Sequence, residues 1–306
     1  MKLAILFWFY KELDLCESRL VLLRLLNPRL DIFGLYGGPS DGAAEAERRL
    51  GKHLDDFYAY QGAEDAAWRW RNGDRLIAAW HGERGRSLSW DTIIVAQWDA
   101  LFLRPVRSLF RTLKPGEALF SGLRPESEVE QWWPWMMRKR VNFRADAQAF
   151  RARLRKQYGY RQELWCCQFI VACLPRRFLD LYVASGPPEE GFLEYKLPTM
   201  ARLFGIPLCM QHPFRPWWPT EPSTREAPAQ QRILNAIGEC VSLDTVLAEI
   251  AGGRSRVVHP YRHPFPMWLA LRPIAWLCIH VPSLARLMRL MPEPACAPPI
   301  GKVISA

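Results

Sequence analysis

Several features that mark particular protein classes are missing from this chain. No pair of cysteines has the CxxC spacing, so a structural zinc site is not indicated. No unbroken run of about 18 apolar residues occurs, so no membrane-spanning helix is predicted. No internal repeat is visible. Hydrophobic residues at 49% and charged residues at 24% exclude a disordered, collagen-like or coiled-coil chain.

Lysine is also scarce, although the chain is basic. Lys and Arg together number 41 against 31 for Asp and Glu, a formal charge of +10, and only eight of the 41 are Lys. The excess is carried by Arg, whose planar guanidinium pairs with phosphates and carboxylates. This charge allows a nucleic-acid binder, a membrane-surface protein or an enzyme of phosphorylated substrates. No RRM, KH, zinc-finger or helix-turn-helix signature accompanies it, so we expect no nucleic-acid partner.

The cysteines and the N-terminus indicate a reduced, cytoplasmic protein. Cys166 and Cys167 are adjacent within the apolar run 165–174, where thiols usually pack as small hydrophobic groups. The apolar residues 3–10 imitate a signal peptide but pass directly into a charged segment, with no small-residue cleavage site. We therefore expect free thiols and a cytoplasmic location.

Alternating strand-like and helix-like segments predict an α/β sandwich. Residues 3–10 are continuously apolar, which is typical of a strand buried on both faces. Residues 14–27 have apolar side chains at helical spacing, and a second strand over 30–36 completes a β-α-β unit with a parallel strand pair. Further helices are expected at 43–50, 66–81, 176–184 and 191–205, further strands at 53–60, 92–96 and 118–122, and a strand or buried segment at 164–174.

Polar side chains follow two of the expected strands. Tyr10 and Glu12 come after the first strand, and Asp99 comes after the strand at 92–96. In an open α/β sheet, ligands bind beyond the carboxyl ends of the strands. A carboxylate among Trp and aliphatic residues needs a hydrogen-bond donor or a cation. Asp99 therefore either caps the turn after its strand or contacts a divalent ion with a phosphate across it.

The stretch DTIIVAQWDALFLRP, residues 91–105, resembles the DxD region of GT-A fold glycosyltransferases of the nucleotide-diphospho-sugar transferase superfamily, as a divergent bacterial-type member. The likeness covers about residues 1–263, including the acidic run at 189–198 and His259-Pro260. It implies a three-layer sandwich with a mostly parallel sheet and a C-terminal helical extension. It also implies transfer of a sugar from a nucleotide-diphosphate donor to a saccharide or lipid-linked acceptor in glycan biosynthesis.

The resemblance implies a donor site with a divalent metal. Tyr10 and Glu12 would form the base and ribose pocket, and Asp99 would contact Mn²⁺ or Mg²⁺ bridging the diphosphate. Only one carboxylate is present, because Gln97 and Leu101 stand where a second acid would be sought. The amide oxygen of Gln97 or a phosphate oxygen would then complete a shell dominated by oxygen.

A late histidine is the second candidate metal ligand. In the family a late His lies near the metal, and His259 has the corresponding place in the order of the chain. A nitrogen ligand suits Mn²⁺ better than Mg²⁺. Alternatively, His259 packs as a loop residue beside Pro260 and Tyr261. His263 is a weaker candidate for the same role.

Acidic residues before the expected helix at 191–205 are candidates for a catalytic base. A transfer that inverts the anomeric carbon needs a carboxylate to deprotonate the acceptor hydroxyl. Glu194 is the first candidate and Glu190 the second. Alternatively, these acids favour the dipole at the start of the helix. A retaining transfer requires no such base, and the sequence leaves both outcomes open.

Tryptophan clusters beside proline are candidate sugar-binding platforms. The segment 132–135 and the pair Trp217 and Trp218 could stack on an acceptor, although Trp clusters also occur in ordinary cores. We expect Trp217 and Trp218 to contact the acceptor. Arg124 and the basic residues 138–140 could neutralise a diphosphate or an acidic acceptor.

Residues 264–306 are expected to form a basic amphipathic tail interrupted by proline. Its Trp, Leu and Arg residues suit peripheral contact with the inner membrane face, although the tail could equally dock on the domain. Membrane contact would suit a lipid-linked acceptor. Because the second acid is missing, the alternative function is a non-catalytic nucleotide- or glycan-binding protein on the same fold.

Overall fold

A six-stranded sheet forms the centre of the computed structural model, which describes residues 1–136, 141–211, 218, 241–244, 246 and 257–265. Its strands lie in the order β3-β2-β1-β4-β9-β6. The first four are parallel, and β9 runs antiparallel to both β4 and β6. The bounds are β1 Leu3–Phe9, β2 Ile32–Tyr36, β3 Asp56–Ala59, β4 Thr92–Gln97, β6 Leu119–Phe120 and β9 Val171–Pro175.

Strand β1 is covered on both faces, because all seven of its residues are buried. Leu6 and Trp8 belong to the hydrophobic cluster on one face of the sheet, whereas Phe7 and Phe9 belong to the cluster on the other. Since side chains alternate along a strand, a continuous apolar run serves two cores at once. This explains why the run at 3–10 forms the middle of a three-layer structure.

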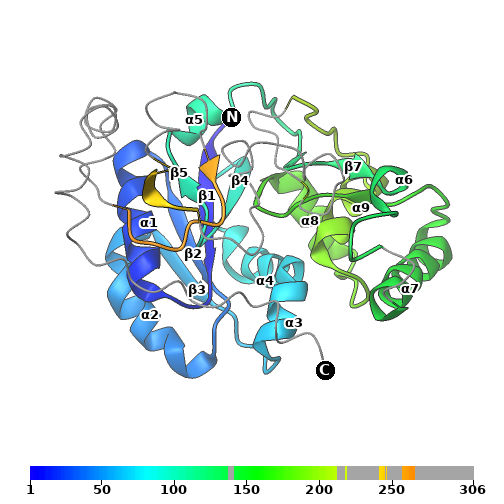
Figure 1. Ribbon diagram of the computed structural model, residues 1–306, viewed down its shortest axis with the longest axis horizontal. Coiled ribbons are helices and arrows are strands. Elements are labelled where there is room, and N and C mark those ends of the chain that lie inside the picture. Colours follow the sequence, from blue (N-terminus) through cyan, green and yellow to red (C-terminus); the bar gives the residue numbers. More distant parts are fainter. Residues whose placement is uncertain (137–140, 212–217, 219–240, 245, 247–256, 266–306) are drawn as a thin grey trace.

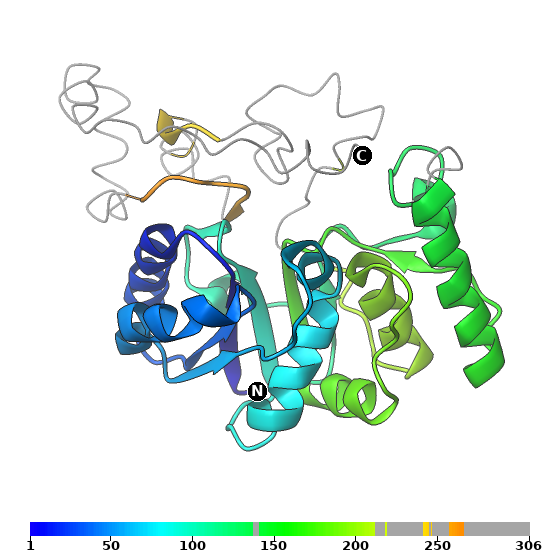
Figure 2. The same cartoon turned by 90° about the horizontal axis from the view of Figure 1, so that it is seen from below.

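Helices cover the two faces of the sheet (Figure 1). Helices α1 (Leu13–Leu26) and α2 (Ala43–Leu50) pack on one face, and α4 (Gly73–Trp80), α8 (Arg176–Ala184) and α9 (Leu193–Leu203) pack on the other. Figure 2 shows the same arrangement from below. The remaining elements are α3 Ala66–Arg71, α5 Val106–Leu109, α6 Glu126–Val129, α7 Val141–Tyr158, η1 Ser40–Gly42, η2 Gly51–His53, η3 His81–Gly85, β5 Leu101–Phe102, β7 Arg124–Pro125, β8 Trp165–Cys166 and β10 Val257–Val258.

These observations confirm the predicted fold class, an α/β sandwich with a mostly parallel central sheet. The five cysteines in the described part of the chain are buried and free of disulfides. Only positions 264 and 265 of the tail expected at 264–306 belong to the described residues. The basic residues 138–140 also lie outside the described residues. None of the helices in the described part of the chain is long and apolar enough to cross a membrane.

Two expected elements are each divided in the structure. The helix expected at 66–81 breaks at Asn72, whose side chain donates to Trp68 O at 3.0 Å and so competes with helical hydrogen bonding. The strand expected at 164–174 divides into β8 and β9. Ser121 holds the loop between them, since Gln168 N donates to Ser121 O at 2.9 Å. That loop reaches the candidate site described below.

The order of the strands defines where a ligand site belongs. The chain runs outward from β1 to β2 and β3 and then returns to β4 on the opposite side of β1. The carboxyl ends of β1 and β4 therefore meet at a topological switch point, which is where open α/β sheets bind ligands.

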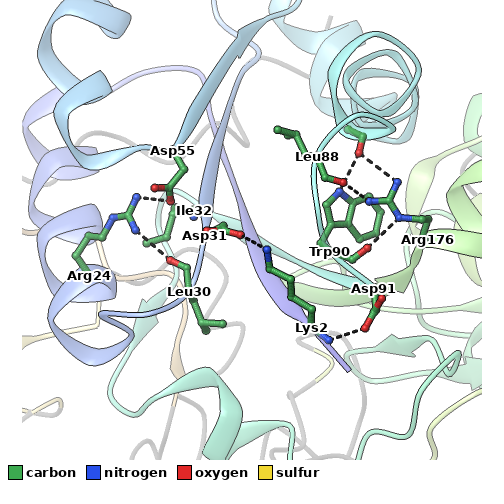
Figure 3. Close-up of polar contacts among 11 residues, drawn as sticks. Lys2, Arg24, Leu30, Asp31, Ile32, Asp55, Leu88, Trp90, Asp91 and Arg176 are labelled. Carbon is green, nitrogen blue, oxygen red and sulfur yellow. Dashed lines mark hydrogen bonds and ion pairs between the residues drawn. The ribbon is translucent and has the colours of Figure 1, made fainter.

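Polar contacts connect the segments at the amino ends of the strands, opposite the carboxyl ends (Figure 3). Lys2 Nζ lies 2.9 Å from Asp31, and the Lys2 backbone N–H donates to Asp91 at 2.6 Å. Arg24 of α1 pairs with Asp55 at 2.6 Å. Arg176 donates to the carbonyl oxygens of Trp90 and Leu88, and Arg24 also donates to that of Leu30.

A buried ion pair joins the helices on one face of the sheet. Lys196 Nζ in α9 lies 3.0 Å from Asp74 Oδ1 in α4, and both side chains are fully buried. The same Nζ donates to Asn72 Oδ1 at 2.9 Å, and Tyr182 of α8 donates to Asp74 Oδ2 at 2.5 Å. Burial lowers the pKa of Lys196, although the charge of Asp74 opposes this effect. The pair therefore fixes α9 relative to α4 and α8.

Lys196→Met is expected to lower the free energy of unfolding by about 3–5 kcal/mol, because it leaves the Asp74 carboxylate buried without its counter-charge. Chemical denaturation measures this change. Lys52→Met is the matched control, since it removes an exposed ion pair with Glu17 at 2.7 Å, and its effect should be much smaller. Equal losses in the two variants would contradict the assignment.

Candidate functional site

A pocket of about 420 Å³ lies at the carboxyl ends of β1 and β2. Its walls come from the end of β1, the turn after β2, the segment between β3 and α3, and α3 itself. The aromatic side chains of Trp8, Tyr10 and Trp70 line it together with Gly37, Gly38, Glu64 and Arg69.

Two glycines let the turn after β2 approach β1 closely. A Cβ on Gly38 would lie 2.4 Å from the Tyr36 hydroxyl and 2.7 Å from the carbonyl oxygen of Tyr10. A Cβ on Gly37 would lie 2.8 Å from Leu76. A side chain at either position would push the turn away from the pocket, so the pair Gly37-Gly38 sets the shape of this wall.

Arg69 stabilises the pocket wall through hydrogen bonds to backbone carbonyl groups of the wall. Its buried guanidinium donates to the carbonyl oxygens of Gly38 and Gly37, and to that of Gly62 at 2.5 Å. It also lies over the Tyr60 ring, 5.6 Å from the centroid. Arg69 was not predicted as a site residue. Its place in a helical segment does not reveal that its hydrogen-bond partners are carbonyl oxygens of distant turns.

Asp99 lies at the carboxyl end of β4 and is 6% exposed. Its Oδ1 is 3.4 Å from His259 Nε2, and its Oδ2 is 3.9 Å from Arg262 Nε. Tyr261 N donates to the Asp99 carbonyl at 2.9 Å. Strand β10 pairs with β5, matching Val258 to Leu101, and so brings the late segment to this site. Sequence analysis proposed Asp99 and His259 but missed Arg262.

The charges around Asp99 keep it ionised. Burial alone would raise the pKa of Asp99, but the neighbouring His259 and Arg262 outweigh burial and bring the pKa below its usual value. The site therefore presents a buried carboxylate with compensating groups on both of its oxygens.

Arg19 of α1 fixes the segment that carries His259 and Arg262. Its Nη2 donates to Tyr261 O at 2.6 Å and to His263 O at 2.8 Å, and its guanidinium lies 4.9 Å from the Tyr261 ring centroid. Figure 1 shows this segment, in orange, beside α1 and β5. The sequence did contain a signal, since Arg19 shares the helical spacing of the apolar residues around it.

Tyr10 connects the pocket to Asp99. It lines the pocket, and burial together with the negative charge of Asp99 raises its pKa to about 12. The next residue, Lys11, places Nζ 5.1 Å from the Trp98 ring centroid, and burial and the charge of Arg262 lower the pKa of Lys11. Glu12 is exposed, has a left-handed φ of 54°, and is not among the residues lining this pocket.

Gln97 and Glu194 both form hydrogen bonds with the backbone of Phe169. Gln97 Nε2 donates to Phe169 O, and Phe169 N donates to Glu194 Oε1 at 2.8 Å. The Phe169 ring lies 6.3 Å from that of Trp8 in the pocket wall. Burial raises the pKa of Glu194 to about 8, although the Phe169 N–H opposes this. The structure thus links the predicted base to the end of β4 and to the pocket.

Glu190 lies elsewhere among the described residues. Its carboxylate pairs with Arg153 of α7 at 3.3 Å. No described contact joins it to Asp99.

The predicted acceptor platform is only partly described, because Trp217 lies outside the described residues. Trp218 is fully buried, and its ring packs edge-on against Trp132 at 5.4 Å and Trp133 at 5.2 Å. Trp218 is therefore a core residue here rather than an open stacking face. Arg124 lies 5.9 Å from the Trp218 ring centroid.

A half-buried aromatic cluster continues from the pocket instead. Trp70 lines the pocket and lies 5.5 Å from Trp135, measured between ring centroids. Both rings also contact Phe192, which Trp135 approaches at 4.4 Å and Trp70 at 5.2 Å. Sequence analysis included Trp135 among the platform candidates but did not identify Trp70.

The side chains around Asp99 fit a divalent metal poorly. Within the described ranges, no group of three His, Cys, Asp or Glu side chains could hold a metal ion. Asp99 and His259 supply two donors, but the guanidinium of Arg262 faces the second carboxylate oxygen. Mg²⁺ and Mn²⁺ favour shells rich in oxygen ligands.

Comparison with known proteins gives likenesses in structure only. No protein-family model matches the sequence, and no curated protein matches it. The chain resembles a putative glucose-1-phosphate thymidylyltransferase from Bacillus anthracis, solved with sucrose, at 12% identity and TM-score 0.38, over 76% of this chain and 96% of that one. It resembles the inositol-1-phosphate CTP transferase from T. maritima at 8% identity and TM-score 0.40, over 68% and 84%. It also resembles mouse xyloside xylosyltransferase 1, apo form, at 12% identity and TM-score 0.36, over 69% and 85%.

Arg19→Met is expected to release the segment 257–265, because it removes both hydrogen bonds that fix the segment to α1. Hydrogen exchange should show faster exchange there by about tenfold or more, since each charged hydrogen bond contributes about 1.5–3 kcal/mol. Arg24→Met on the same helix removes contacts at the opposite edge and should leave this segment unchanged. Unchanged exchange in Arg19→Met would contradict the anchoring role.

Glu194→Gln is expected to stabilise the protein at alkaline pH. Because burial raises the folded-state pKa of Glu194 to about 8 from 4.5, its contribution to stability is fully present below pH 4.5 and is lost as pH rises through about 8. The variant keeps an oxygen acceptor for Phe169 N but cannot ionise. Its Tm advantage over wild type should therefore grow from about pH 5 to about pH 9. Glu190→Gln is the control, and a constant difference for Glu194→Gln would contradict the assignment.

Proposed function

We propose that this protein is a glycosyltransferase that moves a sugar from a nucleotide-diphosphate donor to a hydroxyl of a saccharide or lipid-linked acceptor. One observation carries the proposal. Tyr10 lines the pocket at the ends of β1 and β2, and the charge of Asp99 at the β1–β4 switch point acts on the same side chain. This arrangement offers a nucleoside pocket beside a phosphate-binding site.

The pocket supports nucleoside binding by its size and lining. Pockets of about 300–1,000 Å³ hold drug-sized ligands, and this one measures about 420 Å³. Trp8 and Tyr10 supply aromatic surface, and Trp8 Nε1 is a buried donor without a hydrogen bond among the described residues. Lys11 and Arg262, next to Asp99, supply positive charge for the diphosphate.

In the proposed reaction, the acceptor oxygen forms a bond to the anomeric carbon while the bond from that carbon to the diphosphate breaks. The departing nucleoside diphosphate takes the bonding electrons, and nearby cations stabilise its charge. For an inverting transfer, Glu194 in its ionised form takes the proton of the acceptor hydroxyl. The half-buried rings of Trp70 and Trp135 offer a face for the acceptor sugar.

UDP or GDP is expected to raise the Tm of the full-length protein, and Tyr10→Ala to weaken binding roughly tenfold, because stacking on an aromatic ring contributes about 1–3 kcal/mol per base. Calorimetric titration measures the affinities. Tyr160→Ala removes a half-buried tyrosine that does not line the pocket and should leave the affinity unchanged. Failure of both nucleotides to bind wild type would refute the proposal.

A non-catalytic nucleotide- or glycan-binding protein is the second candidate. The single carboxylate at the end of β4, already compensated by His259 and Arg262, favours it. Slow hydrolysis of UDP-sugar or GDP-sugar separates the two functions. Hydrolysis that is reduced in Glu194→Gln supports the transferase, and tight binding without any turnover supports the binding protein.

A further inference from the structure

We propose that Arg262, together with Lys11, binds the diphosphate directly, so that the site needs no divalent cation. This inference rests on the proposed function for the identity of the substrate, but it concerns a site for the diphosphate anion itself. It gives Arg262 and Lys11 the role that a divalent metal would otherwise have at the diphosphate.

Unsatisfied polar atoms gather beside Asp99. Arg262 Nε and His259 Nδ1 are buried, and neither makes a hydrogen bond within the described part of the chain. Buried polar groups in proteins are almost always hydrogen-bonded, so such a cluster indicates a missing polar ligand. Both atoms are ring or guanidinium nitrogens, and a guanidinium donates only. An oxyanion supplies the acceptors that this site lacks.

The local charge also favours an anion. Lys11 and Arg262 both lie near Asp99, and the charge of Arg262 lowers the pKa of Lys11. Two cations that repel each other in a partly desolvated site are both stabilised when an anion binds between them. Asp99 balances only one of them and orients the Arg262 side chain toward the end of β4.

A divalent cation would meet the opposite situation. The guanidinium of Arg262 lies 3.9 Å from Asp99 Oδ2, so a metal ion bound to that oxygen would lie close to a like charge in a buried site. A guanidinium, in contrast, matches two phosphate oxygens at once. Arg262 therefore supplies, from the chain itself, the positive charge that a bridging metal would provide.

The arrangement is held from outside the site. Arg19 anchors the carbonyls of Tyr261 and His263 on either side of Arg262, and Tyr261 N bonds the Asp99 carbonyl. The backbone at Arg262 is thus held in place before a ligand binds, which lowers the entropic cost of binding.

The test is calorimetric titration of the full-length protein with inorganic pyrophosphate, in EDTA and separately with excess Mn²⁺. Wild type is expected to bind pyrophosphate in EDTA, so that Mn²⁺ is not required for binding. Arg262→Met should weaken binding in EDTA about tenfold or more, in line with a charged hydrogen-bonded contact. Arg262→Lys should restore part of it, and Lys11→Met should weaken it as well. Arg48→Met, in an exposed pair with Glu45 on α2, is the control and should bind as wild type.

Two results would overturn the inference: pyrophosphate binding that requires Mn²⁺, or binding in EDTA that Arg262→Met leaves unchanged. Absence of pyrophosphate binding in both buffers would overturn it too. A melting curve for each variant shows that it is folded. UDP and GDP are titrated in parallel. If pyrophosphate binds through Arg262 but neither nucleotide binds more tightly than pyrophosphate, the anion site stands and the proposed nucleotide-sugar function fails.

Discussion

The burial of the Asp99 carboxylate is the constraint on which the candidate site depends. A carboxylate that is 6% exposed and still ionised needs compensation, which burial in an apolar site does not supply. The chain meets this need with residues more than a hundred positions away, His259 and Arg262. The pairing of β10 with β5 and the anchor at Arg19 are what place them there. Without these contacts the end of β4 would hold an uncompensated charge.

Two residues connect the end of β4 to its surroundings, Tyr10 on the side of the pocket and Phe169 on the side of Glu194. Tyr10 belongs both to the pocket and to the surroundings of Asp99, so the two share one side chain. On the other side, Phe169 joins Gln97 to Glu194 through its backbone. The buried pair of Lys196 and Asp74 holds α9, and with it Glu194, against α4. A pocket, a buried carboxylate with charged neighbours and a carboxyl group of raised pKa are therefore connected near the carboxyl ends of β1 and β4.

Much of the fold could be predicted because local patterns determine it. Continuous apolar runs indicated β1 and β4, and helical spacing indicated α1 and α8. The divided elements could not be predicted in the same way. Asn72 breaks a helix because its side chain bonds both Trp68 and Lys196, and Ser121 holds a loop inside an apolar run. In both cases, one partner is remote in sequence, Lys196 for Asn72 and Gln168 for Ser121.

The sequence by itself determined which residues reach the carboxyl ends of the strands. Tyr10, Gln97 and Asp99 follow from strand boundaries alone, because the end of a strand fixes where the next residues lie. Only the tertiary structure decided their partners. Arg262 on Asp99 and Arg69 on the turn after β2 depend on segments meeting across the fold. The exposure of the tryptophans is also a matter of packing, since Trp218 is buried while Trp70 lines the pocket. Hydrophobic periodicity predicts which face of an element a residue occupies. Long-range packing alone decides which side chains and charges surround the residue on that face.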